Sequence, residues 1–263
     1  MLNRVFPSAF ICLLLVFVTL PFHSTAQEDA EVKALYTKTE QMIPMRDGVK
    51  LFTAIDTPKD QSQSYPIMLY RTPYSVTPYG LNAYRTALGP SELFQKEKFI
   101  FVYQDVRGKF MSEGEFVEVR PYNPKKTGPK DIDESTDAWD TIDWLLKNVP
   151  NNNGRAGMWG ISYPGFYTSM GAIDAHPALK AASPQAPIAD WFIGDDFHHN
   201  GALFLPHAFN FFSTLGKPRP QRTTEFPPRF VHGTPDGYRF FFDLGPLPNA
   251  NRQYLKGEIA FWN

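Results

Sequence analysis

Cysteine is almost absent from this chain of 263 residues: the only one is Cys12, inside an apolar segment near the start. If that segment is removed from the mature protein, no disulfide, cysteine nucleophile or thiolate metal site can form. No group of His, Asp and Glu residues has the spacing of zinc ligands, and there is no glycine-rich phosphate loop. The sequence therefore predicts neither a metal ion nor an organic cofactor.

Net charge is also nearly absent. The 26 Lys and Arg residues almost balance the 27 Asp and Glu residues, for a formal net charge of -1. This balance argues against nucleic acid or an anionic surface as the main partner. By contrast, 43% of the residues are apolar, 15% are aromatic and 24 are prolines. Such a composition is typical of a large globular enzyme with aromatic-lined loops rather than of a helical bundle.

The first 26 residues have the pattern of a secretory signal peptide. Arg4 precedes an apolar run over residues 10–20, Pro21 ends that run, and small residues follow up to Ala26. We therefore expect residues 1–26 to be a signal peptide cleaved after Ala26. The protein is then secreted or periplasmic, with no stable membrane insertion after cleavage. The apolar run is short for a membrane span, so an uncleaved anchor is the alternative.

Strands and helices alternate between residues 27 and 187. Periodicity and turn residues predict strands over 49–55, 66–70, 99–105, 155–161 and 179–182, and helices over 135–147 and 166–175. This order is the signature of an α/β fold with a mostly parallel, doubly wound sheet. Sites in such sheets lie beyond the carboxyl ends of the strands, where Tyr74, Asp105 and Ser162 fall.

Three local expectations accompany this order. Val49, Leu51, Thr53 and Ile55 stand at alternate positions of the strand over 49–55, which should therefore bury one face. Asp47-Gly48 in front of it should form a hairpin-type turn. Asp105 and Arg107 should pair with each other and order the loop over 107–129, rather than take part in a reaction.

Residues 157–165, Gly-Met-Trp-Gly-Ile-Ser-Tyr-Pro-Gly, have the pattern of a nucleophile elbow. A short apolar strand leads into Ser162, and the flanking glycines let strand and helix backbones pass close together. Gly165 comes one place later than in Gly-x-Ser-x-Gly, and Pro164 takes its usual position, which the first turn of a helix tolerates. The pattern favours a serine hydrolase. The alternative is an ordinary turn or helix-cap serine.

The character of the chain changes near residue 188. Aromatic residues are interleaved with Asp195, Asp196 and histidines, and no alternation typical of strands persists. We expect three parts: the signal peptide at 1–26, an α/β core at 27–187 and a partial helical cap over 188–263.

Seven blocks stand in order along the chain, at residues 45–51, 71–74, 104–108, 112–116, 139–144, 160–165 and 190–197. Together they resemble the α-amino-acid ester hydrolases and cocaine-esterase-like enzymes, which are relatives of the X-Pro dipeptidyl-peptidases. The resemblance implies an α/β-hydrolase core, a helical cap and a C-terminal jelly-roll domain. It also accounts for the late glycine, because the elbow of this family looks like Gly-x-Ser-Tyr-x-Gly.

The resemblance further implies the roles of four residues. Ser162 would be the nucleophile of a Ser-Asp-His triad, and the backbone N–H of Tyr163 and the hydroxyl of Tyr74 would form the oxyanion hole. Asp196 would be one member of a carboxylate cluster that holds the ammonium group of the substrate. The alternatives are that Tyr74 is a half-buried tyrosine at a strand end, and that Asp195 and Asp196 cap a helix.

The acid and the histidine of such a triad follow the nucleophile in the chain, and neither is assigned. In this family both are expected beyond Asn263, so the chain should stop before the last core strands and the jelly-roll domain, and should have little activity alone. None of the histidines outside the signal peptide is assigned as the catalytic base. These five residues are His176, His198, His199, His207 and His232.

The favoured interpretation is a secreted serine hydrolase that cleaves esters or amides of α-amino acids through an acyl-enzyme on Ser162. Its partner would be a small molecule or short peptide with a free α-amino group, and the chain could form a homo-oligomer. The alternatives are an X-Pro dipeptidyl-peptidase, a general carboxylesterase of the same family, and an inactive hydrolase-fold binding protein.

Overall fold

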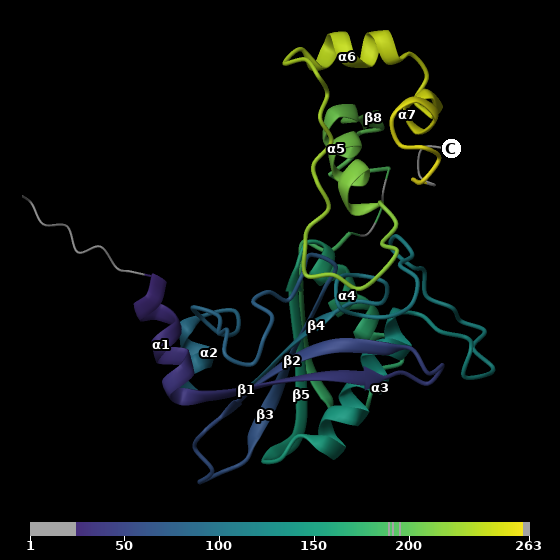
Figure 1. Ribbon diagram of the computed structural model, residues 1–263. Coiled ribbons are helices and arrows are strands. Elements are labelled where there is room, and N and C mark those ends of the chain that lie inside the picture. The colour runs from purple at the N-terminus through teal and green to yellow at the C-terminus, as the bar shows by residue number, and fades with distance from the viewer. Residues whose placement is uncertain (1–24, 189, 191, 195, 260–263) are drawn as a thin grey trace, which may run out of the picture.

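A six-stranded mixed sheet organises the chain (Figure 1). The computed structural model describes residues 25–188, 190, 192–194 and 196–259. The strand order is β1-β2-β4-β3-β5-β6. In chain order, β1 to β6 span Tyr36–Pro44, Lys50–Pro58, Tyr65–Thr72, Ile100–Asp105, Asn152–Ile161 and Leu179–Gln185. The signal peptide predicted at 1–26 lies outside the described residues, except for its last two, which begin helix α1 (Thr25–Leu35).

The predicted α/β fold with a mostly parallel sheet is confirmed. β3 runs parallel to β4 and to β5, and β5 runs parallel to β6. β2 is antiparallel to both β1 and β4. The sequence did not predict β1, because its residues are largely polar and only alternate ones are buried. Its conformation comes from pairing with β2 along its whole length.

β2 differs from the prediction that it would bury only one face. Nearly every residue in it is buried. Leu51 and Ile55 pack into the core on the α3 side, while Phe52 and Ala54 pack into a second cluster on the opposite face. Elements far away in the sequence cover both faces, so the local alternation carries no information about the second one. The turn before β2 is as predicted: Gly48 has a φ of 90°, and Met45 N donates to Val49 O at 2.8 Å.

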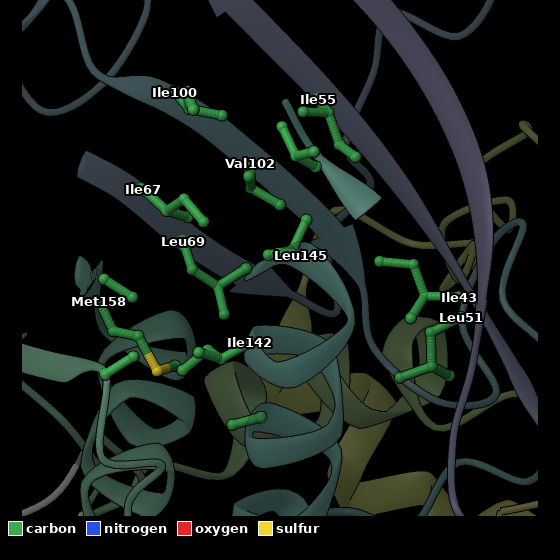
Figure 2. Close-up of a cluster of buried hydrophobic side chains, with 14 of the residues drawn as sticks. Ile43, Leu51, Ile55, Ile67, Leu69, Ile100, Val102, Ile142, Leu145 and Met158 are labelled. Atoms are coloured by element: carbon green, nitrogen blue, oxygen red, sulfur yellow. The ribbon is translucent and has the colours of Figure 1, made fainter. Parts of the chain in front are cut away.

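Helix α3 (Glu134–Asn148) covers one face of the sheet and confirms the predicted helix. Its start is fixed by a capping box, in which the Asp133 carboxylate accepts from the backbone N–H of Thr136. Figure 2 shows Ile142 and Leu145 of this helix directed at the strand residues of the same cluster. Both side chains are fully buried, and each such burial contributes about 1.5–3 kcal/mol.

Helix α4 (Tyr163–Ala172) follows β5 and begins three places before the predicted helix, because the chain turns from strand into helix at a single residue. The short helix α2 (Glu92–Lys96) lies in the connection between β3 and β4. Strand β6 closes the described sheet, and its residues are largely exposed.

The region after residue 196 forms a group of helices beyond the end of the sheet, above α4 in Figure 1. It contains α5 (Leu205–Leu215), α6 (Gly237–Leu244), α7 (Pro248–Gln253) and the small hairpin of β7 (His198–His199) and β8 (Ala202–Leu203). The sequence did not predict this hairpin. Aromatic side chains such as Phe209, Phe212 and Phe240 give the region a hydrophobic core of its own. In the part of the chain that the structure describes, no helix has the length and apolar character needed to span a bilayer.

Candidate active site

Ser162 occupies a strained turn between β5 and α4. Its φ of 63° and ψ of -124° are a backbone conformation that residues with a side chain rarely adopt. The Ser162 side chain makes no capping hydrogen bond to the helix, which disfavours the alternative of a helix-cap serine. Instead, the backbone holds the turn: Ser162 N donates to Gln185 O of β6 at 2.9 Å, and Phe166 N donates to Ser162 O at 3.0 Å. The residue is half-buried.

The two flanking glycines are required by close backbone contacts. A Cβ atom on Gly160 would lie 2.3 Å from the carbonyl carbon of Pro164, and one on Gly165 would lie 2.5 Å from Gln185 O. Neither neighbour is a flexible side chain that could move aside. Strand β5, helix α4 and strand β6 therefore meet at this turn with no room for side chains at either position. The late second glycine is the one that lies against β6.

Tyr163 and Tyr74 lie together beside this turn. As the first residue of α4, Tyr163 has a backbone N–H without an intrahelical acceptor. Its buried ring stacks on Tyr167, with centroids 5.1 Å apart, and its hydroxyl accepts from Val119 N at 2.7 Å. The ring of Tyr74 stands edge-on to the Tyr163 ring, with centroids 6.1 Å apart and an interplanar angle of 89°. The structure thus brings the side-chain rings of these two sequence-predicted residues into edge-on contact.

The surroundings of Tyr74 keep its phenol protonated. Burial raises the pKa of the Tyr74 hydroxyl well above its usual range, and the nearby charges of Glu118 and Asp196 raise it further. A protonated phenol can donate a hydrogen bond to a developing oxyanion, as the predicted role requires.

Asp196 itself is exposed in the described chain. A carboxylate in that position attracts a cation less strongly than a buried one, because water around it screens the charge. The neighbouring Asp195 lies outside the described residues.

Asp105 holds the segment that carries Tyr74. Its fully buried carboxylate accepts from Val76 N at 3.0 Å, from the Tyr79 hydroxyl at 2.9 Å and from Met111 N at 3.2 Å. Burial raises the pKa of Asp105 to about 7, while these hydrogen bonds oppose the rise. The carboxylate thereby joins the chain after β3 to the turn after β4.

The predicted pairing of Asp105 with Arg107 is wrong. Arg107 instead forms ion pairs with Asp137 of α3 and with Asp47 of the β1–β2 turn, both at 2.7 Å. The two side chains serve different neighbours, because Asp105 is engaged by the segment after β3 while Arg107 reaches toward the start of α3.

Sequence reasoning missed a buried ionic cluster at that helix start. The Arg71 side chain is fully buried, 3.2 Å from a carboxylate oxygen of Glu134 and 3.6 Å from one of Asp137. The available signal was the pair of arginines, Arg71 and Arg107, near the carboxyl ends of two neighbouring parallel strands.

The histidines of the described chain contact aromatic residues. The His176 ring lies 4.7 Å from that of Trp139. In the region after residue 196, the rings of His199, His207 and His232 lie 4.2, 5.5 and 4.8 Å from those of Phe204, Phe197 and Phe240. None of these four ring contacts involves Ser162. Nor do three or more His, Cys, Asp or Glu side chains gather as metal ligands anywhere in the described ranges.

Comparison with known proteins agrees with this geometry. The family model described as X-Pro dipeptidyl-peptidase (S15 family) matches residues 47–225. A cocaine esterase from Rhodococcus sp. (strain MB1 Bresler) is 32% identical over 175 residues, which cover 66% of this chain and 28% of that protein. A venom dipeptidyl peptidase 4 from Vespa velutina is 26% identical over 155 residues, and the match covers 18% of it.

Two solved structures resemble the chain over most of its length. An α-amino acid ester hydrolase aligns with a TM-score of 0.73 and 35% identity, over 96% of this chain and 40% of that one. An aminopeptidase from a marine sediment Thaumarchaeota archaeon aligns with a TM-score of 0.71 and 39% identity, over 86% and 37% of the two chains. The chain thus spans less than half the length of these relatives. With its elbow, sheet and matched residues, it belongs to the X-Pro dipeptidyl-peptidase family of α/β-hydrolases, which includes the cocaine-esterase-like enzymes.

Proposed function

We propose that this protein is a serine hydrolase that cleaves esters or amides of α-amino acids. The single observation that carries the proposal is the strained turn at Ser162, held between two glycines that cannot bear a side chain. A serine presented in this way is the usual nucleophile of an α/β-hydrolase. Relatives named as an esterase, a dipeptidyl peptidase and an α-amino acid ester hydrolase support acyl transfer as the chemistry.

In the proposed mechanism, Ser162 Oγ attacks the acyl carbonyl and the carbonyl oxygen becomes an oxyanion. The Tyr163 N–H and the Tyr74 hydroxyl donate hydrogen bonds to that oxygen, and one such donor typically lowers the barrier by about 3 kcal/mol. The alcohol or amine leaves with the proton that Ser162 gave up, and water then releases the acyl group. We assign no general base among the described residues.

A fluorophosphonate probe tests the nucleophile directly. We expect the complete protein to be labelled and its Ser162→Ala variant to lose the label, because the probe phosphonylates only an activated serine. Ser169→Ala is the matched control: Ser169 lies in the same helix, half-buried, and its hydroxyl donates to Gly165 O. Absence of label on the parent protein, or equal labelling of Ser162→Ala, would favour an inactive binding protein instead.

Recognition of the substrate's ammonium group by Asp196 is the second part of the proposal. The charge of the exposed Asp196 carboxylate contributes to the raised pKa of Tyr74, and a hydrogen bond to a charged group is worth about 1.5–3 kcal/mol. Asp196→Asn in the complete protein is therefore expected to lower kcat/KM about 10- to 150-fold for phenylalanine methyl ester. The des-amino ester, methyl 3-phenylpropanoate, should be hydrolysed at an almost unchanged rate.

Asp190→Asn serves as the control for that substitution, since Asp190 is exposed in the same segment and accepts from Phe192 N. Equal losses on both esters would remove the ammonium role and leave a general carboxylesterase. An X-Pro dipeptidyl-peptidase would retain the ammonium preference and add a requirement for proline.

We also propose export with cleavage after Ala26, which N-terminal sequencing of the mature protein would check.

A further inference from the structure

A cavity of about 390 Å³ opens beside Tyr74, between the turn after β4 and the proline-rich segment that follows α5. Its walls are mainly apolar, and the rings of Phe110 and Phe226 stand 5.0 Å apart at 67° in one of them. Tyr74 and Pro73 contribute the wall nearest the elbow, whereas Ser162 does not line the cavity. The cavity therefore adjoins the proposed catalytic site through the phenol that would bind the oxyanion.

The charged residues in this cavity are mostly cations. Lys109, Lys217 and Arg219 line it, against the exposed Glu225. Lys109 is only 8% exposed; its ammonium donates to Leu215 O and lies 3.9 Å from the centroid of the Phe116 ring. Within the described residues, neither Lys109 nor Arg219 forms an ion pair with a carboxylate.

Arg219 is fixed by the backbone of the turn after β4. Its guanidinium donates to Phe110 O and to Ser112 O, the latter at 2.6 Å. Its Nε is buried and has no hydrogen-bond partner in the described part of the chain. Lys109 and Arg219 thus line the same apolar cavity, and among the described residues both donate hydrogen bonds to backbone carbonyl oxygens only. Arg219 also has a donor, Nε, that none of these residues uses.

A buried cation without a counter-ion, such as Lys109, is costly, and an anion beside it and the half-buried Arg219 would be stabilised. Burial lowers the pKa of Lys109 to about 8, and the charge of Arg219 lowers it further, while Glu118 opposes this shift. Burial also lowers the pKa of Arg219, and the charge of Asp105 opposes that shift. Neither carboxylate is within ion-pair distance, so the two cations remain available to a ligand.

The geometry points to an anion subsite in this cavity: Lys109 and Arg219 bind a carboxylate on the leaving group, and Phe110 and Phe226 contact its apolar body. The assignment to the leaving group rests on the proposed function. In the proposed function, Asp196 binds the ammonium group on the acyl part of the substrate. The preferred substrates therefore carry a positive charge on the acyl part and a negative charge on the leaving group. They have a free α-amino group on the acyl part and a carboxylate on an apolar leaving amine, as a dipeptide does.

Calorimetric binding of 3-phenylpropanoate to the full chain tests the subsite, with the uncharged 3-phenylpropanamide as the matched ligand. Both are titrated at pH 7 into the Ser162→Ala variant, so that the result does not depend on catalysis. We expect the carboxylate to bind at least about tenfold more tightly than the amide, since a hydrogen bond to a charged group exceeds 1.4 kcal/mol. Lys109→Met and Arg219→Gln should each abolish this preference. Lys180→Gln, an exposed lysine on β6, should leave it unchanged.

Equal affinities for the acid and the amide, or no binding of either, would overturn the proposal. So would a preference that persists in both Lys109→Met and Arg219→Gln. If circular dichroism shows that one of these two variants is unfolded, the other variant still tests the proposal. So does the comparison of the acid and the amide on the Ser162→Ala protein with Lys109 and Arg219 intact. If the protein with Ser162 intact takes up no fluorophosphonate label but the preference for the carboxylate is present, the proposed function is refuted and the subsite is retained. If the protein is labelled but shows no preference for the carboxylate, the subsite is refuted and the proposed function is retained.

Discussion

Replacing Gly160 with alanine is expected to lower the free energy of unfolding by more than about 4 kcal/mol, a size reserved for severe steric or core defects. The added Cβ would lie 2.3 Å from both the carbonyl carbon and the oxygen of Pro164. To make room, helix α4 must move away from β5, which would break the hydrogen bonds that hold the Ser162 turn. Urea unfolding followed by circular dichroism measures the change.

Gly157→Ala is the matched control for this prediction, because Gly157 lies in the same strand. A Cβ atom there would meet Ala181 O and Met68 Sδ at 3.6 Å, which is ordinary contact. Its effect should stay within about 1 kcal/mol, the usual range for a tolerated substitution. If Gly160→Ala were no worse than Gly157→Ala, the close approach of strand and helix at the elbow would be contradicted.

Arg71→Leu is the second substitution with a large expected effect. It should lower the free energy of unfolding by about 3–5 kcal/mol, because the buried Glu134 carboxylate loses its nearest cation, whereas Asp137 keeps Arg107. Arg71 is fully buried, donates to Gln104 Oε1 at 2.8 Å and to Glu134 O at 3.0 Å, and neutralises Glu134 and Asp137. Burial already raises the pKa of Glu134 to about 7, and Arg71 is the main charge opposing that rise. Removing the arginine raises the pKa further.

The pH dependence identifies this mechanism. A carboxyl with a raised pKa in the folded state holds its proton more tightly when folded than when unfolded, so stability falls as pH rises through the window above its unfolded pKa. The unfolding free energy of Arg71→Leu should therefore decline more steeply than that of the parent between about pH 5 and 8. Urea titrations at several pH values measure both slopes.

Arg46→Leu provides the comparison for the buried cluster. Arg46 pairs with Asp140 at 2.7 Å, but its side chain is 32% exposed, so solvent screening should limit the loss to about 1 kcal/mol. Equal losses for Arg46→Leu and Arg71→Leu would show that burial of the cluster has no energetic consequence.

Much of the fold was predictable because its signals are local. The periodicity of residues 135–147 predicted α3, and the apolar runs predicted β3, β4 and β5, since these elements bury faces that their own sequence defines. β1 and the second buried face of β2 were not predictable, because they depend on strand pairing and on clusters assembled from distant segments. Helix α4 was placed late because its start depends on the turn rather than on an apolar pattern.

The candidate site divides in the same way. Within one short stretch, the sequence alone determined the elbow, because the backbone at Gly160 and Gly165 has no space for a side chain and only such residues allow the Ser162 turn. Tertiary structure decided which groups surround it: the edge-on contact of Tyr74 with Tyr163, the partners of Arg107, the exposure of Asp196 and the cation-lined cavity. Lys109 and the Leu215 carbonyl that it binds are separated by 106 positions in the chain. No local pattern encodes such a pairing, since it arises only when the folded core brings the two segments together.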